Sequence, residues 1–228
     1  MSSFPLITFN FLKQLQNNNN REWFEKNRKN YLEAKVKFEE FVSEILKELE
    51  KFENLGDLTA KQCIFRINRD IRFSSDKTPY KRNMSAAFAL GGKKSPYHPY
   101  YLHIEPGGKS FLGGGLYDPD KEKLTKVRQE IDYNKETLIE IIENREFKKY
   151  FTGISGEKLK TAPKGYPKDH PDINLLKFKQ YIIIHQLNNG QILDENFSNL
   201  IIDVFKVMKP FLDWLNFVII DKYPPDIK

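Results

Sequence analysis

The sequence holds one cysteine, Cys63, among its 228 residues. A single cysteine excludes an internal disulfide and a zinc site built from cysteine thiolates, and it is typical of proteins in a reducing compartment. No stretch approaches the roughly 18 uncharged apolar residues of a membrane span, so no membrane partner is expected. The N-terminal residues lack the cationic start, apolar core and small-residue cleavage site of a secretory signal. Together these absences predict a cytoplasmic protein.

Length and composition predict one domain with a large core. A chain of 228 residues fits the size range of single α+β domains, and a chain of this size buries roughly 70% of its unfolded surface. Eighteen phenylalanines and eleven tyrosines supply bulky core side chains. Because no internal repeat or low-complexity linker interrupts the chain, we predict a single domain over residues 1–228.

Positive charge is concentrated in one short segment. The net charge of the whole chain is +6. Between Lys61 and Arg82 the chain carries seven basic and only two acidic residues, an excess of five positive charges. Such an excess raises the local concentration of anions. The alternative is a solvated segment whose charges pair with one another.

Both ends of the chain have features of helices. Residues 8–53 place apolar side chains at helical spacing. After the middle region, Asp118 and Pro119 have the residue types of an N-cap and a first helical position. Residues 152–174 are rich in proline and glycine and are expected to form a loop. Residues 193–221 are predicted to form a long closing helix.

The middle of the chain alternates with the period of two that is typical of strands. From residue 61 to residue 73, apolar side chains occupy mainly odd positions and polar ones even positions, which predicts a strand with one buried face. Arg69 falls on the apolar positions, so either a bulge or a buried partner must accommodate it. Further strands are predicted at residues 84–90, 100–105, 110–112 and 181–187.

Helices on both sides of a run of short strands predict an α+β domain. Tight turns between consecutive strands favour antiparallel pairing. We therefore expect a central antiparallel sheet, a meander over about residues 61–117 with a further strand near residues 180–187, packed with the N-terminal and C-terminal helices.

The densest group of charged residues spans Arg66 to Lys81. Arginine side chains bind carboxylate or phosphate oxygens two at a time, and arginines that flank Asp70 on one strand face can clamp an anion or orient each other. We expect Asp70 to orient the arginines or act as a base, and Asp76 to hold a turn or serve as a second carboxylate. The alternative is an Arg–Asp lattice with a structural role. The predicted ligand-binding residues are Arg66, Arg69, Arg72, Lys77, Tyr80, Lys81 and Gly114.

The pattern R-x-x-R-D-x-R-F-x-x-D-K-x-P-Y-K, which begins at Arg66, resembles the signature of the domain of unknown function 2461 family, conserved proteins of bacteria and fungi. Other motifs of this family resemble Asn19–Phe24, Tyr100–Gly107, Gly113–Tyr117, Pro163–Tyr166 and Asp169–Pro171. The resemblance covers essentially the whole chain and implies a single domain. It implies no reaction and no catalytic residue, because the family has none assigned.

Glycines and histidines supply further candidates. Gly113–Gly115 can cradle a phosphate with backbone N–H groups, although a tight turn or a close approach of strands needs the same glycines. His103 and Glu105 share one face of a predicted strand, but no third ligand lies at a diagnostic spacing and no metal is predicted. His170 either fixes a loop or acts as a general acid or base if that loop folds over the basic segment. The catalytic candidates are Asp70, Asp76, His103 and His170.

Three functions remain open from the sequence. The first is a site for an anionic small molecule that bears phosphate or carboxylate groups, with or without catalysis. The second is a nucleic-acid-binding module, because Tyr80, Tyr97, Tyr100 and Tyr101 lie near the basic segment and bases stack on such rings. The third is a non-catalytic protein-interaction or scaffold domain. The sequence predicts no particular cofactor and no oligomeric state.

Overall fold

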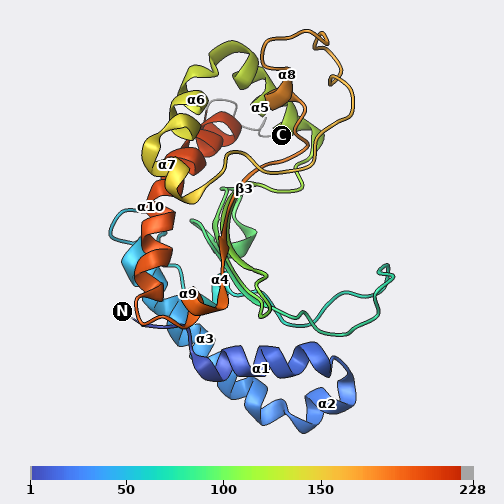
Figure 1. The fold of residues 1–228 in the computed structure, drawn as a ribbon, viewed down its shortest axis with the longest axis vertical. Coiled ribbons are helices and arrows are strands. Elements are labelled where there is room, and N and C mark those ends of the chain that lie inside the picture. Colours follow the sequence, from blue (N-terminus) through green and yellow to red (C-terminus); the bar gives the residue numbers. More distant parts are fainter. Residues whose placement is uncertain (1, 222–228) are drawn as a thin grey trace. The chain divides into compact units, whose positions relative to one another are not determined.

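The computed structural model describes residues 2–221, which form helices and one sheet (Figure 1). The longer helices are α1 (Leu6–Asn17), α3 (Arg28–Leu49), α5 (Lys121–Asn134), α6 (Glu136–Glu143) and α10 (Phe197–Asn216). The shorter helical segments are α2 (Arg21–Lys26), α4 (Ala60–Cys63), η1 (Gly92–Lys94), α7 (Arg145–Tyr150), α8 (Ile173–Leu176), α9 (Asn189–Leu193) and η2 (Phe217–Asp221). None of the helices within residues 2–221 is long and apolar enough to cross a membrane.

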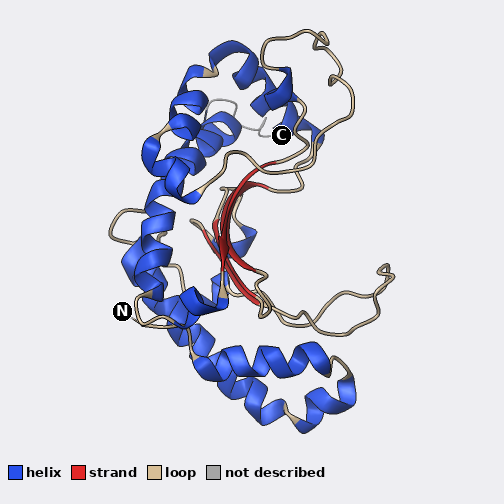
Figure 2. Ribbon diagram, in the orientation of Figure 1, coloured by secondary structure: helices blue, strands red, loops and turns tan. Residues whose placement is uncertain are grey.

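Four strands form one antiparallel sheet in the order β1-β2-β3-β4. The strands are drawn in red in Figure 2. They are β1 (Met84–Phe88), β2 (Tyr100–Ile104), β3 (Ser110–Leu116) and β4 (Tyr181–Leu187). The predicted α+β class with a central antiparallel sheet is therefore confirmed.

The chain divides into two compact units. The first unit comprises residues 2–95, 101–112 and 186–204, and the second comprises residues 96–100, 113–185 and 205–221. The chain passes from one unit to the other within β2, β3, β4 and α10. The prediction of a single domain stays a prediction.

In the first unit, α1 and α3 pack through one apolar stripe on each helix. Side chains such as Leu12 of α1 and Phe38 of α3 are fully buried, while the remaining faces of both helices are polar. Phe4 precedes α1 and packs edge-on against Phe38 and Phe41, with ring centroids 6.0 and 5.4 Å away. This packing fixes the start of α1 against α3.

The strands differ in how their two faces are covered. Every residue of β1 is buried. In β2 burial alternates: Leu102 and Ile104 are fully buried, whereas Tyr101 and His103 are only half-buried. The period of two predicted for this strand is thus present. It leaves one face of β2 partly open within the first unit.

The predicted strand over residues 61–73 is wrong as a continuous strand. The chain instead forms α4 and then makes only isolated antiparallel bridges, Ile64 with Ala86 and Asn68 with Tyr80. We call residues 64–82 the arm, since they run out and back and project away from β1 (Figure 1). Phe73, expected on a buried face, is 97% exposed at the arm's loop. The alternation fails there because the chain turns back after Arg69 and no neighbouring strand covers it.

Other element boundaries also differ from the expectation. Helix α5 begins at Lys121, because the carboxylate of Asp120 accepts a hydrogen bond from the Lys123 N–H at 2.8 Å and caps the helix there. Asp118 has a positive φ of 47° and lies outside the helix. Gly113–Gly115 lie inside β3 rather than in a turn. The closing segment is divided into α9, α10 and η2.

In the second unit, α5 holds the loop that follows α7. The guanidinium of Arg128 donates to the carbonyl oxygens of Leu176 and Phe178 at 2.8 and 3.0 Å. Residues 152–172 form the loop that was predicted, and α8 begins at its end. Because Arg128 bonds backbone carbonyls, it fixes the chain that leads into β4.

Candidate functional site

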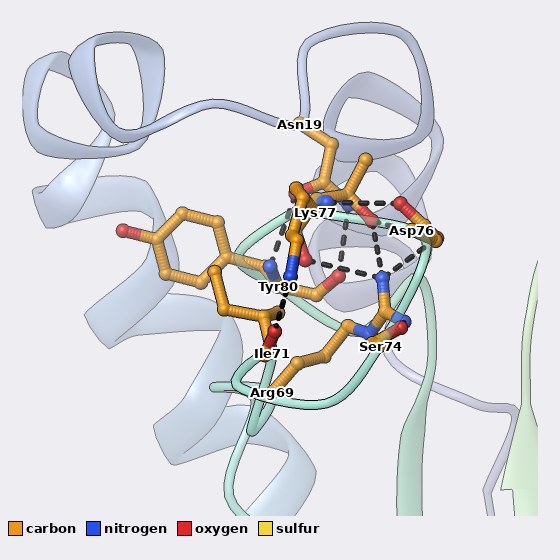
Figure 3. Close-up of polar contacts among 8 residues, drawn as sticks. Asn19, Arg69, Ile71, Ser74, Asp76, Lys77 and Tyr80 are labelled. Atoms are coloured by element: carbon orange, nitrogen blue, oxygen red, sulfur yellow. Dashed lines mark hydrogen bonds and ion pairs between the residues drawn. The ribbon is translucent and has the colours of Figure 1, made fainter.

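The arm is attached to the first helices at Tyr80. The side-chain amide of Asn19, between α1 and α2, donates to the Tyr80 carbonyl at 2.9 Å and accepts from the Tyr80 N–H at 3.1 Å (Figure 3). The Tyr80 ring stacks on Phe24 with 3.8 Å between ring centroids. Tyr80, predicted to bind a ligand, is itself buried. Its ring therefore anchors the arm.

Arg69 braces the loop at the end of the arm. Its guanidinium donates to Asp76 Oδ2 at 2.7 Å, to the Thr78 carbonyl at 3.1 Å, to Thr78 Oγ1, and to Ser74 Oγ at 3.2 Å (Figure 3). The pKa of Asp76 falls to about 2, because the Thr78 N–H and hydroxyl and the Arg69 guanidinium all bond its carboxylate. The partner that the sequence required for Arg69 is therefore its own loop.

Two more cations of the arm are engaged locally. Arg72 Nε and Nη2 donate to the two carboxylate oxygens of Asp70 at 3.0 and 2.7 Å, and this pairing lowers the pKa of Asp70. Lys77 Nζ donates to the carbonyl of Ile71 at 3.1 Å (Figure 3). Arg69, Arg72 and Lys77 thus all have partners in the loop.

Arg66 and Lys81 differ from these three. Neither side chain forms a hydrogen bond or an ion pair with any residue in the described range 2–221. Lys81 is half-buried, and its Nζ lies 5.3 Å from the centroid of the Phe65 ring. Burial lowers the pKa of Lys81, and the positive charge of Arg66 lowers it further. The charge of Arg66 also acts on Asp70, but neither Arg66 nor Lys81 forms an ion pair within residues 2–221.

A row of polar side chains runs along the half-buried face of β2 and beyond its end. Tyr101 Oη lies 3.3 Å from His103 Nδ1, and His103 Nε2 lies 3.3 Å from Glu105 Oε2. Lys109 Nζ is 3.7 Å from the other carboxylate oxygen of Glu105. Burial lowers the pKa of His103, the hydrogen bond and charge of Glu105 oppose that shift, and the charge of Lys81 adds to it.

We call this row, together with Arg66 and Lys81, the polar sheet face. All of its residues belong to the first unit, and the ring of Phe65, 6.1 Å from the ring of Tyr101, places the base of the arm beside β2. The arrangement provides two cations for an anion and a histidine for proton transfer. The sequence placed His103 and Glu105 on one strand face but gave no signal that Lys81 lies beside them. The same alternation puts Tyr101 on this face, and the structure adds its hydrogen bond to His103.

Gly114 takes no part in the polar sheet face. A Cβ atom added there would clash with Met208 Sδ and lie 3.0 Å from the Pro99 carbonyl oxygen, all within the second unit. Glycine at this position therefore permits close packing.

His170 also belongs to the second unit. Its Nε2 lies 2.9 Å from Asp132 Oδ1, and its Nδ1 accepts from the Asp172 N–H at 3.0 Å. These two contacts tie the loop that carries His170 to Asp132 of α5.

No other described feature offers a comparable site. Within residues 2–221, no three His, Cys, Asp or Glu side chains are grouped to hold a metal ion. A groove of about 340 Å³ lies on the first unit. It is lined by Leu6, Ile7, Asn10, Phe11, Gln14 and Asn30. Since none of these residues is charged, the groove does not fit the predicted anion.

Comparison with known proteins gives one match. A family model described as a conserved hypothetical protein, DUF2461, matches residues 7–214. No curated protein and no solved structure matches the chain. The matched residues include the whole arm and the polar sheet face, and the resemblance based on the motifs is confirmed. The chain therefore belongs to the DUF2461 family of conserved hypothetical proteins.

Proposed function

We propose that the first unit binds a small anionic ligand, bearing a phosphate or carboxylate group, at Arg66 and Lys81. One observation supports this proposal above the others: these two cations form no hydrogen bond or ion pair among residues 2–221, and the only acid on which the charge of Arg66 is seen to act, Asp70, is paired with Arg72. By contrast, Arg69, Arg72 and Lys77 of the arm's loop are each engaged by an acid or a carbonyl. A bound anion would supply the missing partner.

The energetics favour an anion at this place. Lysine is rarely buried without a partner, because burial penalises its charged form. At Lys81 that penalty is increased by the charge of Arg66, and both effects lower the pKa of Lys81. An anion between the two side chains would remove the repulsion and form charge-assisted hydrogen bonds. The arginine fork suits phosphate or carboxylate oxygens, and the lysine acts as a point charge.

The same site contains a group for proton transfer. His103 lies within the electrostatic reach of Lys81, and its lowered pKa favours the neutral imidazole at pH 7. Because Nδ1 of the ring is paired with Tyr101 Oη and Nε2 with Glu105, a neutral imidazole would accept a proton from a ligand held by the two cations through the Tyr101 hydroxyl. If the site is catalytic, His103 is the residue that we propose as its acid or base.

We also propose that the protein acts in the cytoplasm. Its single thiol, Cys63, is free and buried, which suits a reducing compartment.

The test is a thermal-shift and calorimetric titration with inorganic phosphate and citrate at constant ionic strength. A ligand at 100 times its Kd should stabilise the protein by roughly 2.7 kcal/mol. Lys81→Met keeps the apolar stem and removes the charge, and Arg66→Gln removes the other cation. We expect each variant to weaken binding at least ten-fold.

Arg82→Gln is the matched control. Arg82 is exposed, neighbours Lys81, and has no hydrogen bond or ion pair with the residues that the structure describes. Arg82→Gln removes one positive charge, as Lys81→Met does, but from a residue outside the proposed site. Binding should therefore be unchanged. If Arg82→Gln weakens binding as much as Lys81→Met, attraction by the basic segment as a whole explains the effect. If no anion binds the unaltered protein, the proposal is wrong.

A further inference from the structure

Four aromatic rings lie on or next to the polar sheet face. Phe65 lies 6.1 Å from Tyr101, Tyr101 lies 5.7 Å from Phe111, and His103 stacks on Phe111 at 4.6 Å, all measured between ring centroids. All four side chains are half-buried. We call Phe65, Tyr101, His103 and Phe111 the ring cluster. It combines rings from β2 and β3, the two central strands, with one from the base of the arm.

The ring cluster is unusual for the open face of a sheet. An antiparallel sheet with one solvated face normally carries polar side chains on that face. Here the Tyr101 hydroxyl and His103 Nδ1 contact each other, and His103 Nε2 contacts Glu105. The surface that these rings present to a ligand is therefore largely carbon. Adjacent rings that stay partly open to solvent favour a planar, apolar group as the occupant.

Lys81 lies directly beside these rings, and the charge of Arg66 acts on Lys81. Lys81 Nζ is 5.3 Å from the centroid of Phe65, and Arg66 follows Phe65 in the chain. The charge of Lys81 also acts on His103. A ligand held at Arg66 and Lys81 by its phosphate therefore has aromatic rings within reach of its remaining part.

We propose that the ligand of this site is a nucleotide, with its phosphate at Arg66 and Lys81 and its base packed on the ring cluster. This inference rests on the proposed function and makes it more specific. Base–aromatic packing requires only a planar ring, so it does not depend on which base is present. A free nucleotide and a nucleotide within a single strand share this chemistry, and the experiment separates the two sources.

The experiment compares AMP and UMP with ribose 5-phosphate and inorganic phosphate by calorimetry of the full chain. Because packing of one base on aromatic side chains contributes substantially to affinity, we expect both nucleotides to bind roughly ten-fold to hundred-fold more tightly than ribose 5-phosphate. A parallel arm uses single-stranded oligonucleotides, an oligo-U and an oligo-dT of about ten nucleotides, at two salt concentrations. Much tighter, salt-sensitive binding of the oligonucleotides would identify a strand as the source, and equal binding would identify the free nucleotide.

Variants separate the rings from the cations. Phe111→Leu and Phe65→Leu should each weaken AMP binding roughly ten-fold and leave phosphate binding unchanged. If one of these variants fails to fold, the other still tests the inference. Phe73→Leu is the control, since Phe73 belongs to the same unit, is 97% exposed and lies outside the ring cluster. If ribose 5-phosphate binds as tightly as AMP, or if Phe73→Leu is as harmful as Phe111→Leu, this inference is wrong while the proposed anion site stands. If phosphate, ribose 5-phosphate and the nucleotides all fail to bind, both proposals are wrong.

Discussion

Asn19 and Tyr80 lie 61 residues apart in the sequence and are joined by two hydrogen bonds, one in each direction, between the Asn19 amide and the Tyr80 backbone. A side-chain amide is the group that can donate and accept in this way. The pair closes the arm onto the turn between α1 and α2. The position of Lys81, the next residue, depends on that closure.

Asn19→Ala should destabilise the protein by roughly 1–3 kcal/mol, since it leaves two partly buried backbone groups without a partner. Asn19→Asp should also destabilise it, because a carboxylate would face the Tyr80 carbonyl. Urea denaturation measures both effects. Asn18→Ala is the control: Asn18 donates only to the Gln14 carbonyl on the exposed surface, and we expect a change below roughly 0.5 kcal/mol. Equal losses at the two positions would show that the arm is not held by Asn19.

The loop of the arm should loosen in acid. The folded pKa of Asp76 is about 2, below its ordinary value of 3.8, owing to the bonds from Thr78 and Arg69. A carboxyl group whose folded pKa is lowered stabilises the fold above its ordinary pKa, and this contribution is lost as the pH falls through the folded pKa. We therefore expect the Thr78 amide resonance to titrate with a midpoint near the folded pKa, and the loop to become sensitive to pepsin over the same range.

Asp76→Asn should remove that titration, because no ionisable group would then face the Thr78 N–H. Asp57→Asn, a change of the same kind outside the arm, should leave it intact. A midpoint near 3.8 in the unaltered protein would show that Asp76 is not bonded as described.

The features that sequence predicted well are those fixed by neighbours along the chain. The alternation of residues 100–105 predicted the two faces of β2, and with them the shared face of His103 and Glu105. The apolar, β-branched run at residues 181–187 predicted β4 with the bounds that the structure has. In both cases the residues of one strand contain the information.

The arm could not be predicted in this way, because contacts far apart in sequence shape it. Its alternation resembles that of β2, but Asn19 and the loop's own side chains decide its path. Arg66 and Arg69 belong to one motif and are the same residue type. Only the way the loop closes decides that Arg69 forms an ion pair with Asp76 while Arg66 forms none within residues 2–221.

The thiol of Cys63 should be unreactive in the folded protein. Burial raises its pKa to about 12, against an opposing effect of the Lys93 charge, and the residue is fully buried. Only the thiolate reacts, so a disulfide reagent at pH 8 should modify Cys63 very slowly in the native state and rapidly in urea. Ser75→Cys in a Cys63→Ala background supplies the exposed control and should react at once. Rapid stoichiometric reaction of the native protein would contradict the burial of Cys63.

His98 should make stability depend on pH in the second unit. Burial, and to a smaller extent the charge of Lys123, lowers its folded pKa to about 4 from an ordinary value of 6.5. Above pH 6.5 the His98 ring is neutral in both the folded and the unfolded protein. As the pH falls below 6.5, His98 of the unfolded chain is protonated before His98 of the folded protein, and this favours unfolding. The free energy of unfolding should therefore decrease between pH 6.5 and pH 4, by roughly 3 kcal/mol for this shift.

Urea denaturation at pH 7, 6, 5 and 4 measures this decrease. His98→Gln replaces the ring by a neutral side chain that does not titrate, so the curve should flatten by the contribution of His98. His170→Gln also removes one histidine from the second unit, where His170 is held by Asp132, and this variant should keep the decrease assigned to His98. If His98→Gln and the unaltered protein lose the same free energy between pH 6.5 and pH 4, then the buried ring of His98 is not the group that couples folding of this unit to protons.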